Sequence, residues 1–164
     1  MKIVTWNVNS INARIEHLVK FIKKDQSDIY LIQELKCTNE SFPYEEIEKI
    51  GYICYVEGQK AWNGVAILSK IKLKILNRRI PTFNEDVQSR FLETEIKINK
   101  IKKPIKLFCI YLPNGNPIET EKFDYKIKWM KKFNEYIFNL YDRNNPIIIG
   151  GDFNVIPTDD DVYS

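Results

Sequence analysis

The sequence predicts an α/β fold in a single domain that includes all 164 residues. An apolar strand-like run at 2–7, an amphipathic helical run at 13–24 and an apolar run at 28–34 follow one another, which is typical of a parallel βαβ unit with a right-handed crossover. A long amphipathic helix expected over 121–141 then precedes an apolar strand at 146–150. With 44% hydrophobic and 29% charged residues, the composition is that of an ordinary globular protein.

Each element of the N-terminal unit has its own local signal. Residues 2–7 are rich in β-branched and aromatic side chains, which favours a strand. Asn12 is a candidate N-cap for the helix over 13–24, because its side-chain oxygen can accept a hydrogen bond from the first turn. The run DIYLIQE at 28–34 predicts the second strand. The apolar residues of the helix lie at the spacing that places them on one face: Ile15, Leu18, Val19 and Ile22.

The remaining elements continue the α/β pattern without an internal repeat or a domain linker. A short helix is expected over 44–49, and the long helix over 121–141 has one apolar side. Three consecutive isoleucines in 146–150 predict a strand that is buried on both faces. Further strands are expected at 52–56, 65–69, 73–80, 92–98 and 105–112.

Charge and hydropathy exclude several classes of protein. The net charge of +3 permits a polyanionic partner without requiring one. No window approaches the ~18 uninterrupted apolar residues of a membrane span, and the N-terminus MKIVTWNV lacks the apolar core of a signal peptide. We therefore expect a cytoplasmic protein with no membrane partner. Its three cysteines, without CxxC spacing, are expected to be free thiols.

Polar side chains end four of the predicted apolar strands. Asn7, Glu34 and Tyr111 each end one, and Asp152 and Asn154 follow the last. For any one of these residues, its polar character could simply reflect the contact of a strand end with water. As a set they favour a ligand site, because ligand sites of open α/β sheets form at the carboxyl ends of strands.

The chemistry of this set points to a hard metal ion. Carboxylates, amides and a phenol are oxygen ligands suited to Mg²⁺, which binds few carboxylates and retains several waters. The sequence has neither a Cys/His cluster for zinc nor a GxxxxGK[ST] phosphate-binding loop. The set therefore favours metal-dependent phosphoryl chemistry.

Five motifs resemble the exonuclease III class of apurinic/apyrimidinic endonucleases. The motif GDFN alone would indicate only the wider superfamily, which includes DNase I, inositol polyphosphate phosphatases and sphingomyelinases. GQK followed by NGVAI is more specific and points to the DNA-repair branch. The five motifs are WNVNS at 6–10, LIQELK at 31–36, GQKAWNGVAILSK at 58–70, YLPNG at 111–115 and GDFNVIPTDDDV at 151–162.

The resemblance implies a fold and an activity. The fold is a four-layer α/β sandwich of the DNase I-like type, in which two packed sheets are flanked by helices. The activity is Mg²⁺-dependent cleavage of damaged double-stranded DNA, 5′ to an abasic site, with Mn²⁺ as an alternative metal. Family members often also have 3′ to 5′ exonuclease or 3′-phosphatase activity.

The resemblance also implies roles for the residues at the strand ends. Glu34 matches the principal metal ligand, and Asn7 lies beside it in the metal site. Tyr111 matches a residue that contacts the phosphate. Asp152 matches the residue that orients or deprotonates the attacking water, and Asn154 one that helps to hold the water or the phosphate.

Three further residues are expected to contact the substrate. Arg90 matches a cation that faces the DNA backbone, and Asn114 matches a polar position that contacts the substrate, although an amide of a different length is common there. Trp62 lies in the GQKAWNG loop, where it faces either the substrate or the interior of the loop.

The family pattern continues beyond Ser164 with a further DNA-contacting segment and a terminal Asp–His pair. The histidine of this chain, His17, lies off the apolar stripe of the first helix and is expected to be solvated. We therefore expect a truncated domain with an incomplete second half: one sheet, little of the second, and an uncovered apolar sheet face. Such a face would be covered by a C-terminal complement or by self-association.

Two other functions remain as alternatives. Without the Asp–His pair, the chain would be a catalytically dead remnant that binds DNA or a partner. A phosphatase acting on inositol phosphates or lipids would keep the same metal residues, but it fits the GQKAWNGVAI motif poorly.

Overall fold

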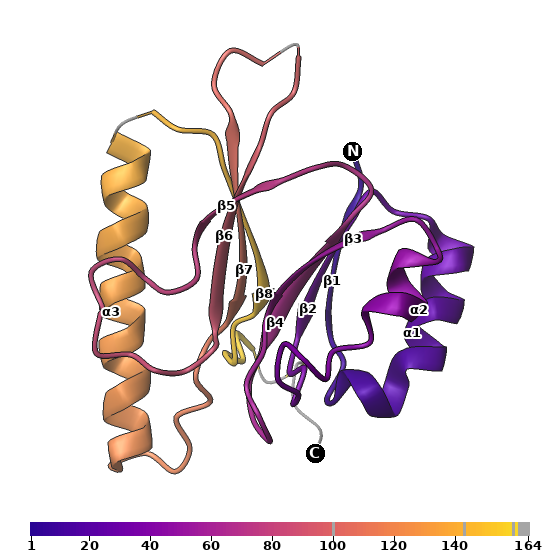
Figure 1. The fold of residues 1–164 in the computed structure, drawn as a ribbon. Helices are drawn as coiled ribbons and strands as arrows, with labels where there is room; N and C mark the ends of the chain where they lie inside the picture. The colour runs from indigo at the N-terminus through magenta and orange to yellow at the C-terminus, as the bar shows by residue number, and fades with distance from the viewer. Residues whose placement is uncertain (100, 143, 159, 161–164) are drawn as a thin grey trace.

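Two β-sheets packed face to face form the centre of the molecule, and helices cover the outer face of each sheet (Figure 1). The computed structural model describes residues 1–99, 101–142, 144–158 and 160. In chain order, the described elements are β1 (Ile3–Asn7), α1 (Ile11–Asp25), β2 (Ile29–Gln33), α2 (Tyr44–Glu48), β3 (Ile53–Glu57), β4 (Val65–Ser69), β5 (Lys74–Asn77), β6 (Phe91–Ile96), β7 (Ile105–Tyr111), α3 (Glu121–Asp142) and β8 (Ile147–Asp152).

The first sheet has the strand order β1-β2-β4-β3 in the described residues. β1 and β2 are parallel and aligned so that Asn7 lies opposite Gln33, and α1 connects them, which confirms the predicted βαβ unit. The predicted helix cap was wrong. Helix α1 begins at Ile11, and Ser10 precedes it and accepts a hydrogen bond from the backbone nitrogen of Ala13 over 3.4 Å. Asn12 therefore lies inside the first turn.

The second sheet has the strand order β5-β6-β7-β8 in the described residues. β7 and β8 are parallel, and their register places Tyr111 opposite Asp152. The strand predicted at 146–150 continues to Asp152 and is half-buried along its length, so the expectation that it is buried on both faces was wrong. The reason is its position: β8 is the last strand of the sheet as described and pairs with β7 alone.

Three apolar clusters hold the layers together. Side chains such as Leu31 and Leu107 fill the space between the two sheets. On the outer face of the first sheet, Leu18 of α1 packs in a cluster that also includes α2. On the outer face of the second sheet, α3 contributes the buried Trp129 and Phe133, whose rings stack with centroids 5.2 Å apart. The order of layers is helix, sheet, sheet, helix, so the predicted four-layer α/β sandwich is confirmed.

The second sheet is more complete than the sequence indicated. We expected one sheet and an uncovered apolar sheet face, but the described residues form four strands in each sheet, and α3 covers the outer face of the second. In the described residues, β1 and β8 are edge strands of their sheets instead, and they contact each other. Exposed apolar side chains follow β8: Phe153, Val155 and Ile156.

Two further expectations concern single residue types. The three cysteines are free thiols, as predicted. His17 is exposed on α1, as predicted for a solvated helix face. No helix in the described part of the chain is both long enough and apolar enough to cross a membrane.

Candidate active site

The strand ends that the sequence singled out lie at one edge of the sandwich. Asn7 ends β1 and Glu34 directly follows β2, and these two strands are parallel neighbours. Tyr111 ends β7 and Asp152 ends β8, which are the parallel neighbours of the other sheet. Because the two sheets pack face to face with β1 against β8, the four side chains reach each other.

Asn7 joins two carboxylates that come from different sheets. Its Nδ2 atom donates to Glu34 Oε1 over 2.8 Å and to Asp152 Oδ2 over 2.7 Å. Its Oδ1 atom accepts a hydrogen bond from the backbone nitrogen of Asn9 over 3.0 Å, which fixes the orientation of the amide. A neutral donor between two carboxylates reduces the repulsion that would otherwise separate them.

Glu34 is held as a carboxylate by three donors. Besides Asn7, the hydroxyl of Tyr111 donates to Oε1 over 2.8 Å, and Lys36 Nζ lies 3.0 Å from Oε2. Partial burial would raise the pKa of Glu34, but the hydrogen bonds from Asn7, Lys36 and Tyr111 outweigh it, so the pKa lies below its ordinary value. Glu34 itself has a positive φ of 55°, in the left-handed region, directly after β2 ends at Gln33.

Tyr111 is a neutral hydrogen-bond donor at physiological pH. Burial, together with the hydrogen bond to Glu34, raises the pKa of its phenol to about 12. The guanidinium carbon of Arg90 lies 4.7 Å from the centroid of the Tyr111 ring. Arg90 also donates from Nη1 to the carbonyl of Tyr111 over 3.2 Å, so the predicted cation lies directly beside the predicted phosphate-contacting phenol.

Asp152 and Asn154 form a tight turn after β8. The Oδ1 atom of Asp152 accepts from the backbone nitrogen of Asn154 over 2.9 Å. The side chain of Asn154 donates to the carbonyl of Leu112 over 2.8 Å and accepts from Asn114 over 3.4 Å. Lys126 of α3 binds both loops, because its Nζ donates to the carbonyls of Asn114 (3.0 Å) and Asn154 (2.7 Å).

A cleft of about 700 Å³ opens beside this cluster. Five of the eight predicted site residues line it: Glu34, Trp62, Arg90, Tyr111 and Asn114. Of the two positions open for Trp62, the structure shows the outward one, because the side chain is 69% exposed. Residues that the sequence did not single out also line the cleft: Lys36, Gln59, Asn63, Gln88 and Tyr125 among them.

The donor atoms at the strand ends fit a hard cation. Glu34 and Asp152 offer carboxylate oxygens, and the amide nitrogen of Asn7 holds these two carboxylates near each other. Among the described residues, no group of three or more His, Cys, Asp and Glu is arranged to hold a metal. Mg²⁺ needs only one or two protein carboxylates, because it keeps much of its water shell. The residues present therefore suit Mg²⁺ and do not form a zinc site.

The fold and the strand-end site together define a DNase I-like α/β sandwich. The family model described as "Endonuclease/Exonuclease/phosphatase family" matches residues 4–164, so the chain belongs to this family. It is 38% identical to exodeoxyribonuclease III of Haemophilus influenzae over 167 residues, which include 99% of this chain and 60% of that protein. It is 26% identical to a DNA-(apurinic or apyrimidinic site) endonuclease of Dictyostelium discoideum over 99% of this chain and 44% of that protein.

Among the solved structures that share the fold, two examples are each 31% identical to this chain. The 3′ phosphatase NExo from Neisseria, bound to a product DNA hairpin, superposes with a TM-score of 0.86 over 97% of this chain and 60% of that one. An AP endonuclease from Archaeoglobus fulgidus superposes with a TM-score of 0.84 over 98% of this chain and 60% of that one. The chain thus spans about three fifths of the length of these two structures and of the Haemophilus protein.

Proposed function

We propose that the protein is a Mg²⁺-dependent DNA-repair nuclease that cleaves the phosphodiester 5′ to abasic sites and also removes nucleotides from 3′ ends. The observation that carries the proposal is the hydrogen-bonded cluster of Asn7, Glu34, Tyr111 and Asp152 at one edge of the two sheets. The nuclease relatives support the choice of DNA as the substrate. We propose that it acts in the cytoplasm, which its free thiols support.

Glu34 would bind the metal through its carboxylate, and Asn7 would orient the metal site, because its Nδ2 atom holds Glu34 and Asp152. Mg²⁺, or Mn²⁺ in its place, would supply positive charge where the phosphate oxygens gain electrons during attack. Lys36 lies 3.0 Å from Glu34 and adds a second positive charge at the same carboxylate. Glu34 and Asn7 lie at the ends of two paired strands, which fix their backbone positions. The site is therefore organised before a substrate binds.

Asp152 is proposed to orient and deprotonate the attacking water. Its two oxygens are already held by Asn7 and by the backbone of Asn154, which fixes the direction of the carboxylate. Tyr111 stays protonated at neutral pH. Its single O–H donates to Glu34 in this structure and would turn to a phosphate oxygen when substrate binds. Asn154 would hold the water or the phosphate beside Asp152.

Arg90, Asn114 and Trp62 are proposed to contact the damaged double-stranded DNA. Arg90 and Asn114 line the cleft and offer N–H donors to backbone phosphates. Trp62 is largely exposed, with Lys36 Nζ 6.0 Å from its ring, and offers an aromatic face for packing against a sugar or base.

The open edge of β1 and β8 is proposed to bind a polypeptide that supplies the part of the fold present in the longer relatives. The edge strands have backbone groups available for further pairing, and the exposed Phe153, Val155 and Ile156 follow directly. Self-association through the same edge is the competing outcome. Light scattering of the 164-residue chain separates them, and a monodisperse monomer at working concentration would count against self-association.

The decisive assay uses a duplex with one abasic site and a 5′ label. We expect nicking with Mg²⁺, none with EDTA, and none with Glu34→Ala, which also controls for contaminating nucleases. Unlabelled abasic duplex should compete and inositol polyphosphate should not; the reverse would indicate a phosphatase. If the chain binds abasic DNA but does not nick it, the alternative of a binding protein without catalysis is favoured.

A further inference from the structure

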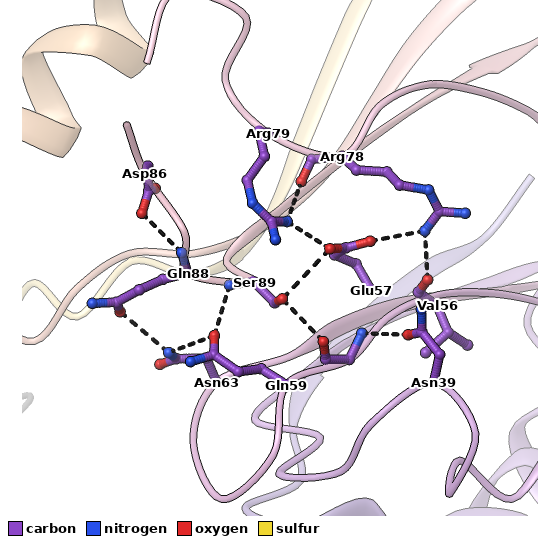
Figure 2. A network of polar contacts seen from close by, with 11 residues as sticks. Asn39, Val56, Glu57, Gln59, Asn63, Arg78, Arg79, Asp86, Gln88 and Ser89 are labelled. Carbon is purple, nitrogen blue, oxygen red and sulfur yellow. Dashed lines mark hydrogen bonds and ion pairs between the residues drawn. The ribbon is translucent and has the colours of Figure 1, made fainter. Parts of the chain in front are cut away.

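Two loops on one side of the cleft are joined by a continuous polar network (Figure 2). One contains the GQKAWNG motif, and the other leads into β6. The backbone nitrogen of Ser89 donates to Gln59 Oε1 over 2.8 Å, and the backbone nitrogen of Gly64 donates to the carbonyl of Ser89 over 2.9 Å. The loops are thus linked at both the backbone and the side chains.

The base of this network is fixed by two ion pairs of the buried Glu57. Glu57, at the end of β3, receives Nη1 of Arg78 over 2.9 Å and Nη1 of Arg79 over 2.6 Å (Figure 2). The hydroxyl of Ser89 donates to the carbonyl of Gly58 over 3.0 Å. Because Gly58 follows Glu57 directly, the anchored end of β3 fixes the position of Ser89, which is the residue after Gln88.

Asn63 is the central link between the loops. Its side chain is 6% exposed, and both hydrogens of its amide are used, toward Gln59 Oε1 at 3.1 Å and Gln88 Oε1 at 3.2 Å. Its backbone has a positive φ of 59°, a conformation that asparagine tolerates better than most residues. A buried amide with all its hydrogens satisfied has one preferred orientation, so Asn63 fixes the position of both glutamine oxygens.

Gln88, which Asn63 holds in place, in turn fixes the position of the Arg90 side chain. The Oε1 atom that accepts from Asn63 also accepts from Nε of Arg90 over 2.7 Å. With Nη1 donating to the carbonyl of Tyr111, the guanidinium is held at two points, and its carbon lies 4.7 Å from the centroid of the Tyr111 ring. An arginine fixed in this way loses less conformational freedom when it binds a phosphate than a mobile one does.

We infer that Gln88 is a positioning residue, which orients Arg90 for the DNA phosphate and couples it to the loop that carries Trp62. The inference rests on the proposed DNA-binding function. Gln88 contacts no substrate atom in this scheme. Its effect on DNA binding is transmitted through Arg90. Replacing Gln88 should therefore change the affinity for DNA only when Arg90 is present.

A double-mutant cycle tests this coupling. Gln88→Met removes the acceptor and keeps a similar side-chain length, and Arg90→Met removes the cation. Fluorescence anisotropy with an abasic-site duplex in EDTA gives the dissociation constants of the wild type, both single variants and the double variant. We expect Gln88→Met to weaken binding about fivefold in the wild-type background and to have no further effect on Arg90→Met. Both single variants should lower the slope of log Kd against log salt by about one.

The controls separate positioning from a general effect on the loop. Val87→Ala changes the neighbouring side chain, which is 81% exposed, and should bind DNA like the wild type. Equal weakening by Gln88→Met in both backgrounds would show a merely structural role. Wild-type affinity in Gln88→Met would overturn the inference as well.

A second measurement requires no DNA. In ¹H–¹⁵N spectra the Nε–H group of Arg90 should exchange slowly with water in the wild type and fast in Gln88→Met. An exchange rate that is unchanged in Gln88→Met would overturn the inference, even if the wild-type chain binds no DNA and the double-mutant cycle cannot be measured. A wild-type chain that binds no DNA but shows the protected Nε–H would reject the proposed function and leave the positioning contact intact.

Discussion

Tyr111 donates its phenolic hydrogen to Glu34 over 2.8 Å, and this bond connects the end of β7 in one sheet with the residue after β2 in the other. The phenol stays protonated to high pH because burial and the carboxylate raise its pKa to about 12. The same hydrogen bond therefore orients the Glu34 carboxylate in the candidate active site and joins the two sheets, so its loss should also lower the free energy of unfolding.

The first prediction concerns that contact. Tyr111→Phe removes one donor from Glu34 and leaves the ring in place, so we expect the free energy of unfolding to fall by about 1 kcal/mol at pH 7. Urea denaturation measures the change. Tyr141→Phe is the matched control, because the Tyr141 side chain is 71% exposed and should be neutral. Equal stability of Tyr111→Phe and wild type would show that the hydrogen bond has no net effect on folding.

The second prediction separates binding from chemistry at Asp152. Asp152→Asn keeps an oxygen for the backbone nitrogen of Asn154 but leaves an amide with no charge to deprotonate water. We expect affinity for abasic duplex to change less than about twofold and the nicking rate to fall at least about 100-fold, the usual range for loss of a general base. Anisotropy and a gel-based nicking assay measure the two quantities. Nicking at the wild-type rate would remove Asp152 from the catalytic group.

The strand-end site was predictable because strand geometry and topology determine it. A parallel βαβ unit places the carboxyl ends of β1 and β2 together, and the β7–β8 pair does the same for Tyr111 and Asp152. The sequence also showed which residues are polar at those ends. The sequence did not predict that the amide of Asn7 bridges Glu34 and Asp152, because this contact depends on how the two sheets pack against each other.

The loop network was not predictable by the same reasoning. Asn63 and Gln88 are 25 residues apart, and neither lies on a regular element or carries a charge. The only available signal was the GQK–NGVAI motif, which contains Gln59 and Asn63 but says nothing of their partners. Burial of β8 was misjudged for a related reason, since three isoleucines predict a buried strand whether or not a neighbour pairs with its far edge.

The third prediction is a pH dependence from the buried thiols. Burial raises the pKa of Cys109 to about 12 and that of Cys37 to about 11, whereas an unfolded cysteine has a pKa of about 8.5. The unfolded chain therefore loses protons first, and the stability present below about pH 8.5 falls as the pH rises toward the folded pKa values. Between about pH 8.5 and 10, before unfolded tyrosines ionise, this fall comes mainly from the cysteines.

Urea denaturation at several pH values in that window tests the third prediction. The double variant with Cys37→Ala and Cys109→Ala should be less stable at pH 7.5, because it loses buried volume. Its stability should nevertheless change less between about pH 8.5 and 10 than that of the wild type. Parallel pH profiles would show that the two thiols do not ionise differently in the folded and unfolded states.

The fourth prediction explains the two glycines that precede Asp152. A Cβ atom on Gly151 would lie 2.0 Å from the carbonyl oxygen of Ile110 in β7, and the residue has a positive φ of 150°. A Cβ atom on Gly150 would instead lie 2.5 Å from Cδ1 of Leu31, the end of a flexible side chain. A backbone atom cannot move without disturbing β7, whereas Leu31 can rotate.

We therefore expect Gly151→Ala to lower the free energy of unfolding by about 3 kcal/mol and Gly150→Ala by about 1 kcal/mol. Urea denaturation at pH 7 measures both values, and an unchanged m-value would show that the two variants unfold like the wild type. Gly151→Ala should also displace Asp152 and lower nicking more than Gly150→Ala does. A Gly151→Ala variant within about 0.5 kcal/mol of the wild type would contradict the prediction. A strand end that holds a catalytic carboxylate this close to its neighbour requires a residue without a side chain, because β8 approaches β7 too closely at that point for any Cβ atom.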